Sequence, residues 1–253
     1  MNRNYFKEFL TFDSDYQLPP DVDYLLSAVG DCLYGFYYQP HRHYHNINHI
    51  INLRHEYLVR EPIASQYLSD VQIHIVMYLS ILFHDVIYNV TAPPGENEFL
   101  SAKMARCLLE NDIFKKYLTQ IIIKHESTTY DTDYTNIINL MKHYVSNIIM
   151  STTNHSCNEN FIEPKIVNYF LDLDLSILSS ISERYSEYSL NIREEYGFLP
   201  DEVFYPARLN IINKFLEQCS NNTLFKVIPS SNINAKNNLE NEKTKILILL
   251  EKL

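Results

Sequence analysis

Apolar residues recur along this chain at the spacing of one helix face. Within residues 21–36, Leu25, Leu26, Val29 and Leu33 are three or four positions apart. Similar patterns predict further helices over residues 45–59, 70–88, 98–111, 114–124, 137–150, 166–178 and 181–196, with a short final helix over residues 243–253. No run alternates apolar with polar residues over the length of a strand series. We therefore expect an all-α fold, a helical bundle.

The helix predicted over residues 70–88 is apolar nearly all round, which is typical of a central helix that others cover on every side. Residues 126–136 and 220–242 are rich in polar residues, and we interpret both as connectors. The length of 253 residues fits one large domain better than two small ones, so we expect residues 1–253 to form a single domain.

The formal net charge of -10 offers no basic surface for folded nucleic acid or for an anionic membrane, so we expect neither partner. Four cysteines lie far apart with no CxxC pair, which argues against a disulfide framework and a thiolate zinc site. The N-terminal residues lack the apolar run of a signal peptide, and no stretch reaches the roughly 18 apolar residues of a membrane span. We expect a cytoplasmic protein.

Histidines and aspartates stand at positions where they can meet one metal ion. His45 and His49 are four residues apart, so on a helix they share a face. His84 and Asp85 are adjacent and would point about 100° apart on a helix, near the 90° between neighbouring octahedral ligands. Singly, each histidine is more often a hydrogen-bonded packing residue. The position of Asp85 in the most apolar helix favours a cation beside it.

A third acidic candidate lies in "NYFLDLDLSIL", where Asp172 and Asp174 interrupt an apolar helix. Asp174, next to Leu175, is harder to leave facing solvent than Asp172. The alternative for both is the polar edge of an amphipathic helix.

Five motifs occur in an order that resembles a known family. They are Arg42 with YHNINH (44–49), FHDVIY (83–88), NEFLSA (97–102), DLDLSIL (172–178) and IREEY (192–196). The chain resembles the HD superfamily across most of its length, in particular the group described as predicted metal-dependent HD phosphohydrolases. A more distant similarity connects YHN-x-x-H with the catalytic domains of cyclic nucleotide phosphodiesterases.

The resemblance implies an HD-type bundle with a buried metal site, whose ligands are His49, His84, Asp85 and Asp174. It implies one or more divalent ions, Mn, Fe, Co, Ni, Zn or Mg. Asp85 then also counts as catalytic, and His45 gives a proton to the leaving oxygen after a metal-activated water attacks phosphorus. His43 is left without a role.

We expect four residues of these motifs to bind substrate, namely Arg42, Asn97, Glu98 and Arg193. Arg193 and Arg208 are suited to phosphate oxygens, or alternatively to capping a carboxylate such as Glu194 or Glu195. His125 and His155 are candidates for a second ion, or else solvent-facing residues at helix ends.

The implied function is a metal-dependent phosphohydrolase that cleaves a phosphate ester of a nucleotide or other small metabolite. The alternative is a catalytically degenerate HD module that binds a nucleotide or a protein partner. The residues that clamp a purine in cyclic nucleotide enzymes are not traceable, so the substrate within this class stays open. The chain also has Pro206-Ala207-Arg208 where the family pattern has glycine before its arginine.

Overall fold

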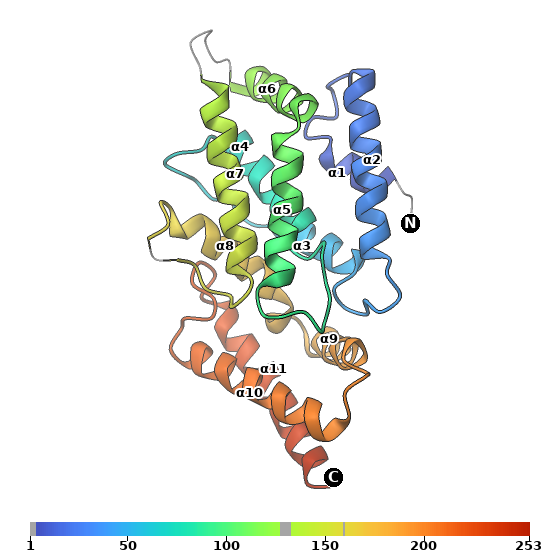
Figure 1. Cartoon of the computed structure of the whole chain (residues 1–253). Helices are drawn as coiled ribbons and strands as arrows, with labels where there is room; N and C mark the ends of the chain where they lie inside the picture. Colours follow the sequence, from blue (N-terminus) through green and yellow to red (C-terminus); the bar gives the residue numbers. More distant parts are fainter. Residues whose placement is uncertain (1–3, 127–132, 159) are drawn as a thin grey trace. The chain divides into compact units, whose positions relative to one another are not determined.

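The computed structural model describes residues 4–126, 133–158 and 160–253, and these residues confirm the all-α prediction (Figure 1). They form eleven α-helices and one 3-10 helix, η1, and the described residues contain no strand. No helix within the described ranges is long and apolar enough to cross a membrane.

The chain divides into two compact units, and each is assembled from separate segments of sequence. Unit 1 comprises Met1–Gln39 and Arg60–Val167, and unit 2 comprises Pro40–Val59 and Asn168–Leu253. The prediction of a single domain stays a prediction.

Unit 1 surrounds one buried helix. Its helices are α1 (Asn4–Leu10), α2 (Pro20–Tyr37), α4 (Asp70–Phe83), α5 (Glu96–Glu110), α6 (Asp112–Glu126) and α7 (Tyr134–Ser151). Helix α4 contacts α1, α5, α6 and α7. Every residue from Ile75 to Phe83 is buried, which confirms the central helix that the apolar sequence predicts.

Helix α4 ends at Phe83, so the prediction that it continues to residue 88 is wrong. The backbone N–H of His84 donates to the Ser80 carbonyl at 2.9 Å, and the next turn is tighter, with Val86 N–H bonded to the Phe83 carbonyl at 3.3 Å. His84 is therefore the C-cap residue, and Asp85 follows the helix.

Helix α5 holds the loop that follows this turn. The Asn97 side chain accepts from the Asn89 N–H at 3.1 Å and donates to the Asn89 carbonyl at 3.0 Å. The Ser101 hydroxyl accepts from the Ile87 N–H at 3.1 Å. Gly95, with φ of 83°, provides the left-handed backbone at the start of α5. Side chains of α5 thus satisfy backbone groups after Phe83 that would otherwise be bonded within a continuing helix.

Unit 2 contains α3 (Ile47–Val59), α9 (Ser182–Glu195), α10 (Asp201–Ser220), α11 (Ser231–Leu250) and η1 (Leu175–Ser179). Helix α8 (Pro164–Asp174) begins at the end of unit 1 and runs into unit 2. Helices α10 and α11 pack side by side, and both α9 and α11 contact η1 (Figure 1).

The interpretation of residues 220–242 as a connector is wrong from Ser231 onward, where α11 begins. Asparagine in a sequence indicates turns, because its side chain competes with the helical backbone. Here Asn238 instead donates to the carbonyls of Leu178 and Ser180, at 3.0 and 2.8 Å. Tertiary hydrogen bonds therefore outweigh local preference in α11.

The hydrophobic pattern does not predict α1 or α10. Helix α1 has only 7 residues, too few to show two turns of periodicity. Helix α10 contains Pro206, which cannot donate a helical hydrogen bond and which usually indicates a helix boundary. The predicted connector 126–136 lies partly outside the described residues.

Candidate functional site

The segment that contains His43, His45 and His49 turns into α3 later than predicted. The Asn46 side chain accepts from the Asn48 N–H at 2.8 Å, and the Asn46 carbonyl accepts from the His49 N–H at 3.1 Å. An asparagine in this role caps a helix, so α3 begins at Ile47. The expectation that His45 starts the helix is wrong, but its ring lies only 6.0 Å from that of His49, centroid to centroid.

His45 is paired with a buried glutamate from the end of α9. Its Nδ1 lies 2.7 Å from Oε2 of Glu195, whose side chain is 0% exposed. The other carboxylate oxygen accepts from the backbone N–H groups of Tyr44 and His45, both at 2.8 Å. Since a carboxylate only accepts, the proton lies on Nδ1, and Nε2 is the atom available for chemistry.

Sequence reasoning missed this role of Glu195, which it treated only as a possible partner for an arginine. The neighbouring Glu194 pairs with His43 at 2.9 Å on the exposed surface. Two adjacent glutamates thus pair with two histidines, one pair partly buried and the other exposed. In the sequence, the only indication of this pairing is weak: two histidines separated by one residue, and two adjacent glutamates.

His49 faces Asp174, the last residue of α8. Its Nε2 lies 3.2 Å from Oδ1 of Asp174, and the side chains are 5% and 10% exposed. Neighbouring ligands bound to one octahedral ion at 2.1–2.2 Å lie about 3.0 Å apart, so this spacing suits a shared metal ion.

Asp172 has different partners although it is only two residues away. Its carboxylate accepts from the backbone N–H groups of Lys226, Val227 and Ile228, at 3.0, 2.6 and 2.7 Å. Burial raises the pKa of this carboxyl, and the amide hydrogen bonds oppose the rise. Asp172 is therefore used in holding the segment before α11.

In unit 1, His84 and Asp85 form a second histidine–carboxylate pair, with 3.0 Å between Nε2 and Oδ2. Nδ1 of His84 lies 3.1 Å from the Ile81 carbonyl, which can only accept. This bond fixes the ring so that Nε2 carries the lone pair, as in metal-ligating histidines. The pairing persists although Asp85 lies beyond the helix end.

The chemistry of the donor set fits a divalent metal ion. His49 and His84 are buried and Asp174 is half-buried, and these three side chains offer ligand atoms of the kind that hold a metal. Imidazole nitrogens with carboxylate oxygens suit transition metals such as Mn, Fe, Co, Ni and Zn, and carboxylates also suit Mg.

Two predicted substrate-binding residues support the backbone around the histidine pairs. Arg42 is 4% exposed and donates to the His45 carbonyl at 3.1 Å. Asn97 holds the loop after His84 through Asn89. Glu98, the third, is half-buried and forms no ion pair with a described residue. Their substrate-binding roles stay predictions.

Arg193 is engaged by contacts within unit 2. It donates to Asp201 at 2.6 Å and to the carbonyls of Tyr196 and Leu199, both at 2.9 Å. Its guanidinium also lies 4.7 Å from the centre of the Phe204 ring. These contacts favour a structural role, and phosphate binding by Arg193 stays a prediction.

The remaining candidates also have local partners. Arg208 is buried and bonds Glu242 through Nε and Nη2, at 2.9 and 3.1 Å. His125 lies 3.1 Å from Asp13 at the surface, and His155 lies in the turn after α7 with φ of 50°. A second ion at these histidines stays a prediction.

Comparison of the chain with protein-family models, with curated proteins and with solved structures found no match.

Proposed function

We propose that this chain is a metal-dependent phosphohydrolase that cleaves a phosphate ester of a nucleotide or other small metabolite. The observation that carries the proposal is the contact of His45 with the buried Glu195 carboxylate, beside the His49–Asp174 pair. A module that only binds metal has use for the His49–Asp174 pair but none for the His45–Glu195 pair. The latter pair adds a histidine equipped to give up a proton.

In this proposal His49, His84, Asp85 and Asp174 hold a divalent ion. The fit rests on the two histidine–carboxylate spacings of 3.2 and 3.0 Å and on the Ile81 carbonyl that orients His84. Such an ion activates a water for attack on phosphorus and offsets the charge that develops there.

The other residues of the site handle the proton. The Glu195 carboxylate accepts a hydrogen bond from Nδ1–H of His45, so the second proton of the protonated ring is on Nε2. His45 can then donate from Nε2 to the oxygen of the departing alcohol. Because Glu195 is itself fixed by two backbone N–H groups, the ring is held in one orientation.

The experiment begins with a screen of phosphomonoesters, cyclic nucleotides and nucleoside phosphates with Mn, Mg, Fe, Co, Ni or Zn. With an active ester found, His45→Asn should slow an ester with a poor leaving group roughly 10²- to 10⁴-fold. An activated aryl phosphate needs little protonation of its leaving group and should lose far less. Metal content should not change.

Glu195→Gln tests the partner, because glutamine has only one accepting oxygen. If that oxygen keeps the two backbone N–H groups, the amide nitrogen faces Nδ1 and cannot accept its hydrogen bond. This variant should also slow the ester with the poor leaving group selectively. The exposed pair gives matched controls, so His43→Asn and Glu194→Gln should leave both esters unaffected. Equal slowing of both esters by His45→Asn, or loss of metal from that variant, would exclude the proton-donor role.

A further inference from the structure

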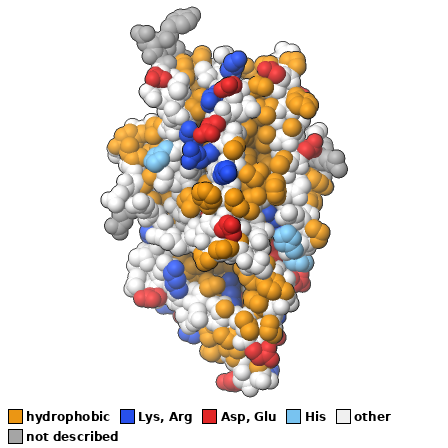
Figure 2. Space-filling model, viewed as in Figure 1, with side chains coloured by type: hydrophobic (Ala, Val, Ile, Leu, Met, Phe, Trp, Pro, Cys, Tyr) orange, Lys and Arg blue, Asp and Glu red, His pale blue; other side chains and the backbone are white. Residues whose placement is uncertain are grey.

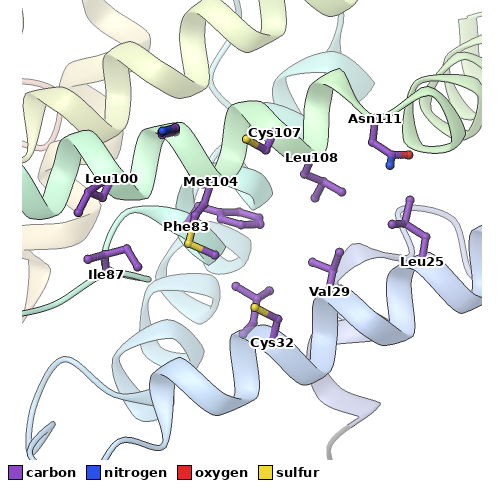
Figure 3. A pocket seen from close by; sticks show the side chains of 12 residues that line it. Leu25, Val29, Cys32, Phe83, Ile87, Leu100, Met104, Cys107, Leu108 and Asn111 are labelled. Carbon is purple, nitrogen blue, oxygen red and sulfur yellow. The ribbon is translucent and has the colours of Figure 1, made fainter.

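Unit 1 contains a pocket whose lining includes none of the residues given a metal-binding or catalytic role above. This pocket of about 440 Å³ lies between α2 and α5, as Figure 3 shows. Leu25, Val29 and Cys32 line it from α2, and Leu100, Met104 and Cys107 line it from α5. Phe83 and Ile87 contribute to the wall, on either side of the His84–Asp85 turn.

The size and lining of this pocket suit a small apolar ligand. Its volume falls within the roughly 300–1,000 Å³ of small-molecule sites, which are mostly apolar with a few polar groups. Here Lys103 and Asn111 are the only lining residues with a charged or amide side chain. A polar or multiply charged ligand would find almost no hydrogen-bonding partners in it.

The shape of the pocket favours a chain over a compact ring system. Lining residues extend along α5 from Leu100 to Asn111, which is roughly 16 Å at about 1.5 Å per helical residue. Figure 3 shows Leu100 and Asn111 at opposite ends of the group. An alkyl chain advances roughly 1.3 Å per carbon, given a single bond of about 1.5 Å, so about a dozen carbons match this length.

The charge of the ligand follows from Lys103. It is three residues after Leu100 and four before Cys107, so it shares their face of α5. Lys103 is exposed and makes no ion pair with a described residue, although acidic residues outnumber basic ones by 31 to 21 in the chain. A carboxylate on a ligand in the pocket would give this exposed lysine a partner of opposite charge.

We propose that this pocket binds a saturated fatty acid of about a dozen carbons, with its chain between α2 and α5 and its carboxylate at Lys103. Four properties of the pocket support this ligand, namely its volume, its apolar lining, its elongated shape and its single cationic residue.

Ligand binding in the pocket can be measured by how fast the cysteines that line it are modified. Cys32 and Cys107 line the pocket and are exposed, whereas Cys157 and Cys219 are buried elsewhere. In the native protein N-ethylmaleimide should therefore modify Cys32 and Cys107 first, as followed by mass spectrometry of peptides. Burial raises the pKa of the Cys32 thiol, so each thiol is compared only with itself.

Dodecanoate, kept below its micelle concentration, should slow modification of both Cys32 and Cys107 at least several-fold. Dodecanol should protect less, because it lacks the charge for Lys103. Met104→Trp, which fills the pocket, should abolish protection by dodecanoate. Lys103→Gln should reduce the protection by dodecanoate to that by dodecanol, while Lys116→Gln, an exposed lysine on α6, should change nothing.

Three results would overturn the proposal. Unchanged rates at both cysteines with dodecanoate would exclude the fatty acid. Equal protection by vesicles of a didodecanoyl phospholipid would mean that the pocket takes a lipid acyl chain and not a free acid. Protection that rises with protein concentration without any ligand, together with a larger species in size-exclusion chromatography, would mean that a second copy covers the groove.

Discussion

Asp172 and Asp174 are two residues apart in α8, and their surroundings give them different functions. Asp172 bonds three consecutive backbone N–H groups of residues 226–228, whereas Asp174 meets Nε2 of His49. One carboxylate is used for structure, and in our proposal the other is used for metal.

Substitution by asparagine should separate these functions. Asp174→Asn should lose most of the bound metal, with little change in the stability of the metal-free chain. Asp172→Asn places an amide nitrogen against backbone donors and removes a charge that they bond, which should cost about 1.5–3 kcal/mol of unfolding free energy. Elemental analysis and urea unfolding measure the two effects. A larger metal loss in Asp172→Asn at unchanged stability would mean that the ligand is Asp172.

At the scale of residues, the sequence indicates which side chains are candidates for the site better than it indicates their bonding partners. Apolar neighbours favour Asp174 over Asp172, and the adjacent His84 and Asp85 are evident by eye. Glu195 could not be assigned, because its partner His45 is 150 positions away and only the fold brings them together. Arg193 illustrates the reverse, since a guanidinium suited to phosphate is bonded to Asp201 and to backbone carbonyls.

At the scale of elements, a buried ion pair joins three helices of unit 2. Arg208 from α10 bonds Glu242 from α11, and Glu242 also accepts from Tyr185 and Ser189 of α9. Burial raises the pKa of Glu242, but the hydrogen bond and charge of Arg208 outweigh it, and the net pKa is lowered.

Breaking this pair on one side should be costly, because it leaves a buried charge without its partner. Arg208→Met should destabilise unit 2 by about 3–5 kcal/mol. The double variant Arg208→Met/Glu242→Gln should recover part of that loss, because glutamine is neutral and still accepts from Tyr185 or Ser189. Urea unfolding measures both, and equal stability of the single and double variants would show that the charge is not the cause.

The same pair predicts a pH dependence with a definite sign. Because the folded pKa of Glu242 is below its ordinary value of 4.5, its stabilisation is complete above that pH. The stabilisation is lost as pH falls through the folded pKa, when the carboxylate is protonated. The Arg208→Met/Glu242→Gln variant should therefore lose less stability in acid than the unsubstituted chain does.

Helix existence was predictable from the sequence where periodicity is strong, and helix ends were not. Helix α3 begins at Ile47 because the Asn46 side chain caps it, and α4 ends at Phe83 because α5 bonds the following loop. Helix α11 extends back to Ser231 because Asn232 bonds the Phe225 carbonyl in the preceding segment and Asn238 bonds the distant Leu178 carbonyl. Each of these ends depends on a side chain whose bonding partner the local pattern does not specify.

At the scale of the whole molecule, the proposed ligands come from different parts of the chain. His49 and Asp174 belong to unit 2, and His84 and Asp85 belong to unit 1. In our proposal one ion binds His49, His84, Asp85 and Asp174, which gives the two histidine–carboxylate pairs a single function.

If one ion has these ligands, metal binding should depend on His84 as much as on His49. An ion that binds only the folded chain stabilises it by about 2.7 kcal/mol at 100 times its dissociation constant. That stabilisation, measured as the rise in melting temperature on adding Mn or Zn, should vanish in His49→Ala and equally in His84→Ala. The double variant should lose no more than either single variant, because residues that act on one ion are not additive. If each single variant removed half of the stabilisation and the double variant all of it, the two pairs would bind separate ions.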